Sequence, residues 1–121
     1  MQNLGYEEDN TPPYFSNVDF TGTLISGQVL TSVIGSYTDA QGDLQNTPPF
    51  YAWKRADDNL GTNLVTVGSA STYTLSALDV SKYIQFCGKA RAVTGASPGT
   101  EQCTIFRGPV TAVMVNVAPT I

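Results

Sequence analysis

The stretch FYAWKR at residues 50–55 decides the fold, because its large apolar side chains fall at alternate positions. A period of two is typical of a β-strand, and it places Tyr51 and Trp53 on the same face. Trp53 is the only tryptophan of the chain, and a lone tryptophan in a short strand is usually a core residue. We therefore predict that Trp53 lies at the centre of the core. The alternative is a surface tryptophan that stacks on a sugar.

Turn-forming residues divide the rest of the chain at intervals of about 8–12 residues, a spacing typical of β-sandwiches. Between the turns lie short runs rich in Val, Ile, Thr, Tyr and Phe, which favour strands. Only residues 76–81 fit a single helical turn. The expected strands are 14–20, 29–37, 50–55, 63–67, 72–75, 82–92 and 101–106, followed by an extended stretch over 110–117. Seven or eight strands without alternating helices predict an all-β sandwich.

Length and composition exclude several classes of function. The chain has 121 residues, enough for one domain, and its net charge is −4 with only 13% charged residues. An acidic surface without a Lys/Arg cluster repels phosphate, so we expect neither nucleic-acid binding nor attachment to anionic membranes. No run approaches the ~20 apolar residues that span a bilayer. The N-terminus lacks the features of a signal peptide, so we expect a protein made in the cytoplasm or a mature fragment.

The two cysteines are expected to face each other. If 82–92 and 101–106 form a hairpin centred on Gly95, Cys87 and Cys103 each lie eight residues from its centre. Directly opposed residues of a hairpin are close enough for a disulfide after slight adjustment. The alternative is a pair of reduced thiols, as in a reducing compartment. The spacing does not suit a redox motif, and two cysteines without histidine are a poor zinc site.

Acidic turns are the only metal candidates, and they are weak ones. Asp39 and Asp43, with Asp57 or Asp58, offer oxygen ligands of the kind that Ca²⁺ takes, but Asp-x-x-Gly-Asp is also an ordinary turn, the interpretation that we prefer. The chain contains no histidine, which excludes Ser-His-Asp and Cys-His arrangements. It also lacks a Gly-x-Ser-x-Gly elbow, a phosphate loop and a dinucleotide-binding turn. We therefore expect no catalytic residues, no enzyme and no cofactor other than calcium.

Five short motifs of the sequence carry a resemblance to a known family. They are Tyr51-x-Trp53, STYTLS at 71–76, DVSKYI at 79–84, GQVLT at 27–31 and Asp39-x-x-Gly42-Asp43. Together they resemble a family of immunoglobulin-like modules found in bacterial surface proteins and phage structural proteins, over about residues 20–108. The resemblance implies an immunoglobulin-like fold, an adhesive or architectural role, and no catalytic residues. It also implies that Tyr83 lies at the corner where a strand begins, with its hydroxyl tying the preceding loop to the sheet.

The sandwich is expected to span residues 14–108, between an N-terminal arm at 1–13 and a C-terminal arm or extra strand at 109–121. The first arm joins Leu4 and Tyr6 to an acidic run. The second is uncharged and β-prone, and a bare strand of that kind aggregates unless something covers it. We therefore predict that both arms bind protein partners, through Leu4, Tyr6, Val113, Met114, Val115 and Val117.

These features predict a non-catalytic structural protein, and three hypotheses follow. The first is a virion-surface decoration (cement) or tail accessory protein, held by its arms among neighbouring copies in a larger symmetric assembly. The second is one module of a bacterial cell-surface or secreted adhesin, supported by the similar sequences at 10–13 and 116–119 and by the disulfide. The third is a carbohydrate-binding module with a glycan stacked on Tyr6, Tyr14, Phe15 or Tyr51.

Overall fold

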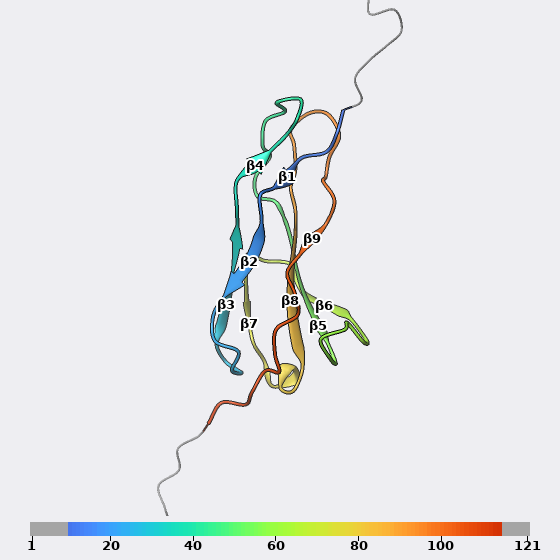
Figure 1. Ribbon diagram of the computed structural model, residues 1–121. Helices are drawn as coiled ribbons and strands as arrows, with labels where there is room; N and C mark the ends of the chain where they lie inside the picture. Colours follow the sequence, from blue (N-terminus) through green and yellow to red (C-terminus); the bar gives the residue numbers. More distant parts are fainter. Residues whose placement is uncertain (1–9, 115–121) are drawn as a thin grey trace, which may run out of the picture.

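The computed structural model describes residues 10–114, and this part of the chain is built from strands (Figure 1). The only helix in it is the short 3-10 helix η1, Ala77–Asp79. The prediction of an all-β fold is confirmed, although several strands are shorter than expected. The strands are β1 Tyr14–Phe15, β2 Val18–Thr21, β3 Val29–Ile34, β4 Tyr37–Thr38, β5 Phe50–Ala56, β6 Val65–Gly68, β7 Thr72–Thr74, β8 Tyr83–Lys89 and β9 Gln102–Cys103.

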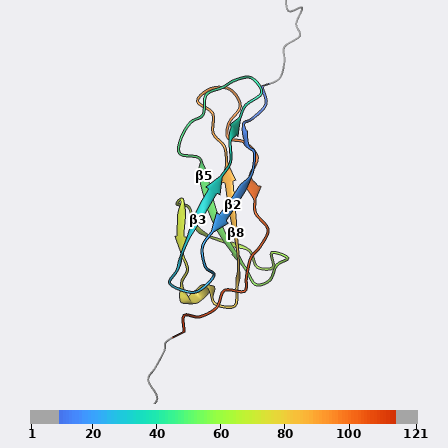
Figure 2. The same ribbon diagram turned by 60° about the vertical axis from the view of Figure 1, so that its left-hand side comes forward.

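Two sheets form the body of the molecule. One has the strand order β2-β3-β7 and the other β6-β5-β8-β9, and every neighbouring pair is antiparallel. The two sheets lie face to face as a β-sandwich (Figure 2). Strands β1 and β4 form a separate two-stranded sheet near the end where the chain begins.

The core between the sheets is centred on Trp53, which has no exposed surface, as predicted. Its ring lies edge-on to Phe20 from the opposite sheet at 5.5 Å, stacks on Tyr73 at 6.1 Å and contacts Phe86 at 4.9 Å between centroids. Its indole N–H donates to the carbonyl of Ala70 at 2.8 Å, so the one polar atom of the ring is satisfied. Burial of large aromatic rings from both sheets is the main force that holds the layers together.

Each of the first two expected strands is divided in two, although the antiparallel pairing between them continues in the same register. The expected strand 14–20 divides into β1 and β2 at Ser16 and Asn17, and the expected strand 29–37 divides into β3 and β4 at Gly35 and Ser36. The backbones are joined at these divisions by hydrogen bonds from Gly35 N to Asn17 O and from Ser16 N to Ser36 O. A Cβ at Gly35 would lie 2.1 Å from Ser16 Oγ. Glycine is required there by the close approach.

The segment that follows the last strand also lies along the sandwich. After β9 the chain follows β8, with bridges from Arg107 to Ile84 and from Val110 to Val80. Val110 is only 1% exposed and belongs to the core cluster. The beginning of the segment 109–121 therefore packs on the sandwich itself, as the extra-strand alternative expects, and the domain boundary stays a prediction.

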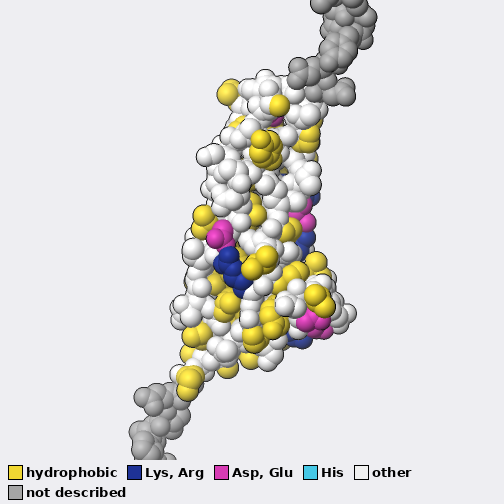
Figure 3. Space-filling model, in the orientation of Figure 1, with side chains coloured by type: hydrophobic (Ala, Val, Ile, Leu, Met, Phe, Trp, Pro, Cys, Tyr) yellow, Lys and Arg dark blue, Asp and Glu magenta, His cyan; other side chains and the backbone are white. Residues whose placement is uncertain are grey.

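The described chain runs from one end of the molecule to the other. Asn10 is hydrogen-bonded to Asp43 and Ala96 in the loops at one end, whereas the last described segment of the chain lies at the opposite end, beside η1 (Figures 1 and 2). Apolar side chains are frequent over the half of the surface near that second end in this view (Figure 3). The two connections to the rest of the chain are thus separated by the length of the sandwich.

Candidate functional site

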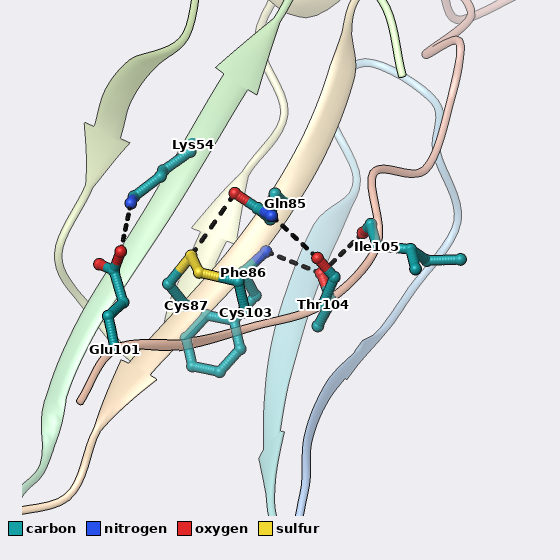
Figure 4. Close-up of a disulfide and its surroundings, with 8 residues drawn as sticks. All are labelled: Lys54, Gln85, Phe86, Cys87, Glu101, Cys103, Thr104 and Ile105. Carbon is teal, nitrogen blue, oxygen red and sulfur yellow. Dashed lines mark hydrogen bonds and ion pairs between the residues drawn. A yellow bond between two sulfur atoms is a disulfide. The ribbon is translucent and has the colours of Figure 1, made fainter. Parts of the chain in front are cut away.

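The outer face of the four-stranded sheet carries a disulfide between β8 and β9 (Figure 4). Ile84 and Phe86 point into the core, so the alternate residues Gln85 and Cys87 point to the other face. Cys87 pairs directly with Cys103 in the ladder, the register that symmetry about Gly95 predicts. The bridge lies within one sheet and does not join the two layers.

Polar side chains from two strands and a loop surround this disulfide (Figure 4). The Lys54 ammonium lies 2.7 Å from a carboxylate oxygen of Glu101. The amide of Gln85 is fixed by donation from Nε2 to the carbonyl of Thr104 at 2.9 Å, which leaves its Oε1 3.5 Å from Cys87 Sγ. Cys87 has no exposed surface.

Three atoms of this cluster can act as metal ligands. The two sulfurs and a carboxylate oxygen of Glu101 lie within 4.8 Å of one another. Sequence reasoning missed Glu101, although a signal existed: it lies two residues before Cys103, and alternate residues of an extended chain share a face. With the disulfide formed, the cluster is a cross-link beside an ion pair.

Three carboxylate oxygens of the weak calcium candidates Asp39 and Asp43 accept hydrogen bonds, whereas Oδ2 of Asp39 is buried without a hydrogen-bond partner among residues 10–114. Oδ1 of Asp39 accepts from the backbone N–H groups of Gln41 and Asp43, at 2.9 and 3.2 Å. The carboxylate of Asp43 accepts from Asn10 Nδ2 at 3.0 Å and Thr94 Oγ1 at 2.8 Å, and these bonds lower its pKa. Through these bonds the pair joins the 39–43 turn to Asn10 and Thr94, and calcium binding at this turn stays a prediction.

Asp57 and Asp58 do not complete a calcium site with Asp39. They lie in the β5–β6 loop, at the opposite end of the molecule from the 39–43 loop (Figure 1). Asp58 accepts from the backbone N–H groups of Leu60 and Thr62, at 2.9 and 3.1 Å. These bonds shape the loop, and together with the Thr62 hydroxyl they lower the pKa of Asp58.

The loop tie expected of Tyr83 is made by a different tyrosine. The Tyr83 ring is half-buried against Gly108, and its hydroxyl has no hydrogen bond within residues 10–114. The Tyr73 hydroxyl instead donates to Oδ2 of Asp79 at 2.7 Å. Asp79 has no exposed surface, and it also accepts from Ser76 N at 2.8 Å, closing a capping box around η1.

The predicted partner-binding residues fall into two groups. Leu4, Tyr6, Val115 and Val117 lie outside the described residues. Val113 and Met114 are 56% and 91% exposed at the end where the chain leaves, and Val113 N is tied to Ser26 Oγ at 3.0 Å. The described beginning of this arm is thus anchored to the sandwich by its backbone while its apolar side chains face solvent.

The glycan hypothesis loses two of its four aromatic candidates. Phe15 is 2% exposed, so its assignment to a sugar platform is wrong. Tyr51 is half-buried and its ring lies 6.2 Å from that of Phe86. Tyr14 is 52% exposed, and Tyr6 is outside the described residues. Among the described candidates only Tyr14 is an exposed ring, and glycan binding stays a prediction.

Residues 10–114 enclose no pocket, and this part of the chain contains no helix that is long and apolar enough to cross a membrane. The candidate sites are therefore surface features: the disulfide cluster, the open strand edges and the two ends. Comparison of the chain with protein-family models, with curated proteins and with solved structures finds no match.

Proposed function

We propose that this chain is a non-catalytic structural protein with an immunoglobulin-like sandwich, which holds its neighbours together through its two ends and an open strand edge. The observation that carries the proposal is that the first and last described segments of the chain lie at opposite ends of the sandwich (Figure 1). Each end can contact a different neighbour, so the sandwich acts as a spacer of fixed length between them.

The strand order supports the immunoglobulin-like assignment. A sheet with order β2-β3-β7 faces one with order β6-β5-β8-β9, an order similar to strands A, B and E against strands C′, C, F and G of such sandwiches, without a strand D. The buried Trp53 on β5 corresponds to the core tryptophan of strand C. The disulfide differs, because in antibody domains it joins the two sheets.

One side of the sandwich is closed and the other is open to a partner strand. Gln102 donates to and accepts from the backbone of Phe15, both at 2.9 Å, and Arg107 donates to the carbonyl of Phe20 at 2.6 Å. These side chains cover the edge formed by β1 and β2. On the other side, β6 is the last strand of its sheet and Val65 on it is 44% exposed. An uncovered edge strand can accept an added strand.

The first setting that we propose is the surface of a virion, where the protein serves as a decoration or tail accessory protein. Two arms at opposite ends suit a protein that bridges adjacent subunits of a symmetric shell. Many copies with weak contacts then gain a large combined affinity. The low fraction of charged residues, 13%, is compatible with extensive contact between copies.

The second setting is a bacterial cell surface, with the sandwich as one module of an adhesin. The disulfide favours this setting, because disulfides persist in oxidising compartments. Connections at opposite ends also suit modules joined in a row. In both settings the partner is protein, and the difference lies in what the two ends contact.

Fractionation of the producing organism tests the proposal. A tagged full chain and a tagged 10–114 chain are expressed in parallel, and cell envelopes and particles are separated on a density gradient. We expect the full chain to sediment with one of these assemblies. Sedimentation with particles supports the virion surface, and sedimentation with cell envelopes supports the bacterial cell surface. The 10–114 chain should remain folded, as judged by Trp53 emission, but it keeps only the β6 edge and should therefore sediment with the assembly much less than the full chain does. Equal sedimentation of both chains, or of neither, contradicts the proposal.

A further inference from the structure

We propose that the dithiol form of this chain binds a thiophilic divalent cation, Zn²⁺ or Cd²⁺, between Cys87, Cys103 and Glu101. This form precedes the disulfide in any newly made chain. The three ligand atoms already lie within 4.8 Å of one another (Figure 4). In a tetrahedral site with Zn–S distances of about 2.3 Å, the sulfurs are about 3.8 Å apart. The required rearrangement is therefore an opening of the S–S bond with small side-chain rotations.

The surroundings supply what such a site needs beyond three ligands. Oε1 of Gln85 lies 3.5 Å from Cys87 Sγ, and its amide is fixed by the Thr104 carbonyl, so it can take the fourth position in competition with water. Two thiolates and a carboxylate carry three negative charges. The ion supplies two positive charges, and Lys54, 2.7 Å from Glu101, supplies the third. The site is thus neutral overall, which favours retention of the ion.

The ligand set also selects the metal. Two thiolates favour Zn²⁺ and Cd²⁺, whereas Ca²⁺ and Mg²⁺ prefer oxygen ligands. The β8–β9 ladder pairs Cys87 directly with Cys103. Little ordering of the backbone is therefore needed when the metal binds. Since the same two sulfurs form the disulfide, metal binding and the cross-link exclude each other, and the ion occupies the chain only while it is reduced.

The test compares oxidised and reduced full-length chain. A water-soluble phosphine reduces the bridge: the disulfide, one phosphine and one water give two thiols and one phosphine oxide. Cd²⁺ is then titrated and followed by calorimetry and by cadmium–thiolate absorption, with release of two protons per ion. We expect one ion per reduced chain and none per oxidised chain. Glu101→Gln should weaken binding by about tenfold or more, whereas Glu8→Gln, which removes the same charge elsewhere, should not.

Three results overturn the proposal. The first is a reduced chain that is folded by its Trp53 emission but binds no Cd²⁺, and the second is equal affinity in the Glu101→Gln and Glu8→Gln variants. If reduction unfolds the chain, Cd²⁺ should restore the emission of a buried tryptophan, because metal binding is then coupled to folding. Failure to restore it is the third contradicting result.

Discussion

The hydroxyl of Tyr73 donates a hydrogen bond of 2.7 Å to Oδ2 of Asp79, a carboxylate without exposed surface. The same carboxylate accepts from the backbone of Ser76 at 2.8 Å and pairs with Arg55 at 3.1 Å. A buried carboxylate is costly unless it is paired and hydrogen-bonded. The Asp79 carboxylate therefore joins β5, β7 and η1. Removal of any one of its partners leaves its charge less well compensated.

Replacement of Tyr73 by phenylalanine should destabilise the fold. Loss of one donor to a buried carboxylate costs about 1–3 kcal/mol, so we expect the free energy of unfolding in urea at pH 7 to fall by that amount. Tyr83→Phe is the matched control, since the Tyr83 hydroxyl has no hydrogen bond among residues 10–114. Its effect should stay within about 0.5 kcal/mol. A larger loss in Tyr83→Phe than in Tyr73→Phe would show that the corner role belongs to Tyr83.

The same tyrosine predicts a loss of stability at high pH. Burial, followed by the hydrogen bond to Asp79 and the charge of Asp79, raises the pKa of Tyr73 to about 12. The unfolded chain releases this proton near pH 10, so between about pH 10 and 12 the folded state holds more protons than the unfolded state. Stability must therefore decrease as the pH rises through this range. Urea midpoints of the natural chain and Tyr73→Phe should converge with rising pH, and parallel curves would contradict the pKa assignment.

The features that sequence predicted correctly are those set by local alternation. Trp53 in the core follows from its place in a strand, and the pairing of Cys87 with Cys103 follows from equal distances to Gly95. In both cases a period of two fixes the face of the sheet on which a side chain lies. No contact between distant segments is needed to reach either conclusion.

The features that sequence missed depend on contacts between distant segments. The divisions after β1 and β3 lie where Gly35 closely approaches Ser16 and Asn17 of the neighbouring segment, and neither segment alone signals this. The choice of Tyr73 over Tyr83 is set by the buried position of Asp79. Local pattern cannot distinguish the two tyrosines, because they flank the same loop, Tyr73 in β7 before it and Tyr83 at the start of β8 after it.

Removal of the disulfide should destabilise the chain without changing its fold. The bridge closes a loop with a sequence separation of 16, and a loop of about 15 residues contributes about 3 kcal/mol by restricting the unfolded chain. We expect Cys87→Ser/Cys103→Ser to lower the free energy of unfolding by about this amount in urea. The natural chain treated with phosphine in the absence of metal should behave in the same way. An unchanged midpoint in both would show that the bridge does not form in solution.

Matched substitutions at Val110 and Val113 test where the C-terminal arm begins. Val110 is 1% exposed, and its backbone is bonded to Lys82 and Ser81 at 2.9 and 2.7 Å, whereas the Val113 side chain is 56% exposed. Loss of two buried methyl groups and the resulting cavity should cost about 1.5–3 kcal/mol in Val110→Ala. Val113→Ala should stay within about 0.5 kcal/mol. Equal small effects of the two substitutions on urea unfolding would show that Val110 belongs to the arm and not to the core. Unequal effects would mean that the partner-binding part begins only after the chain has closed its own core, so that deletions made to test attachment must start beyond Val110.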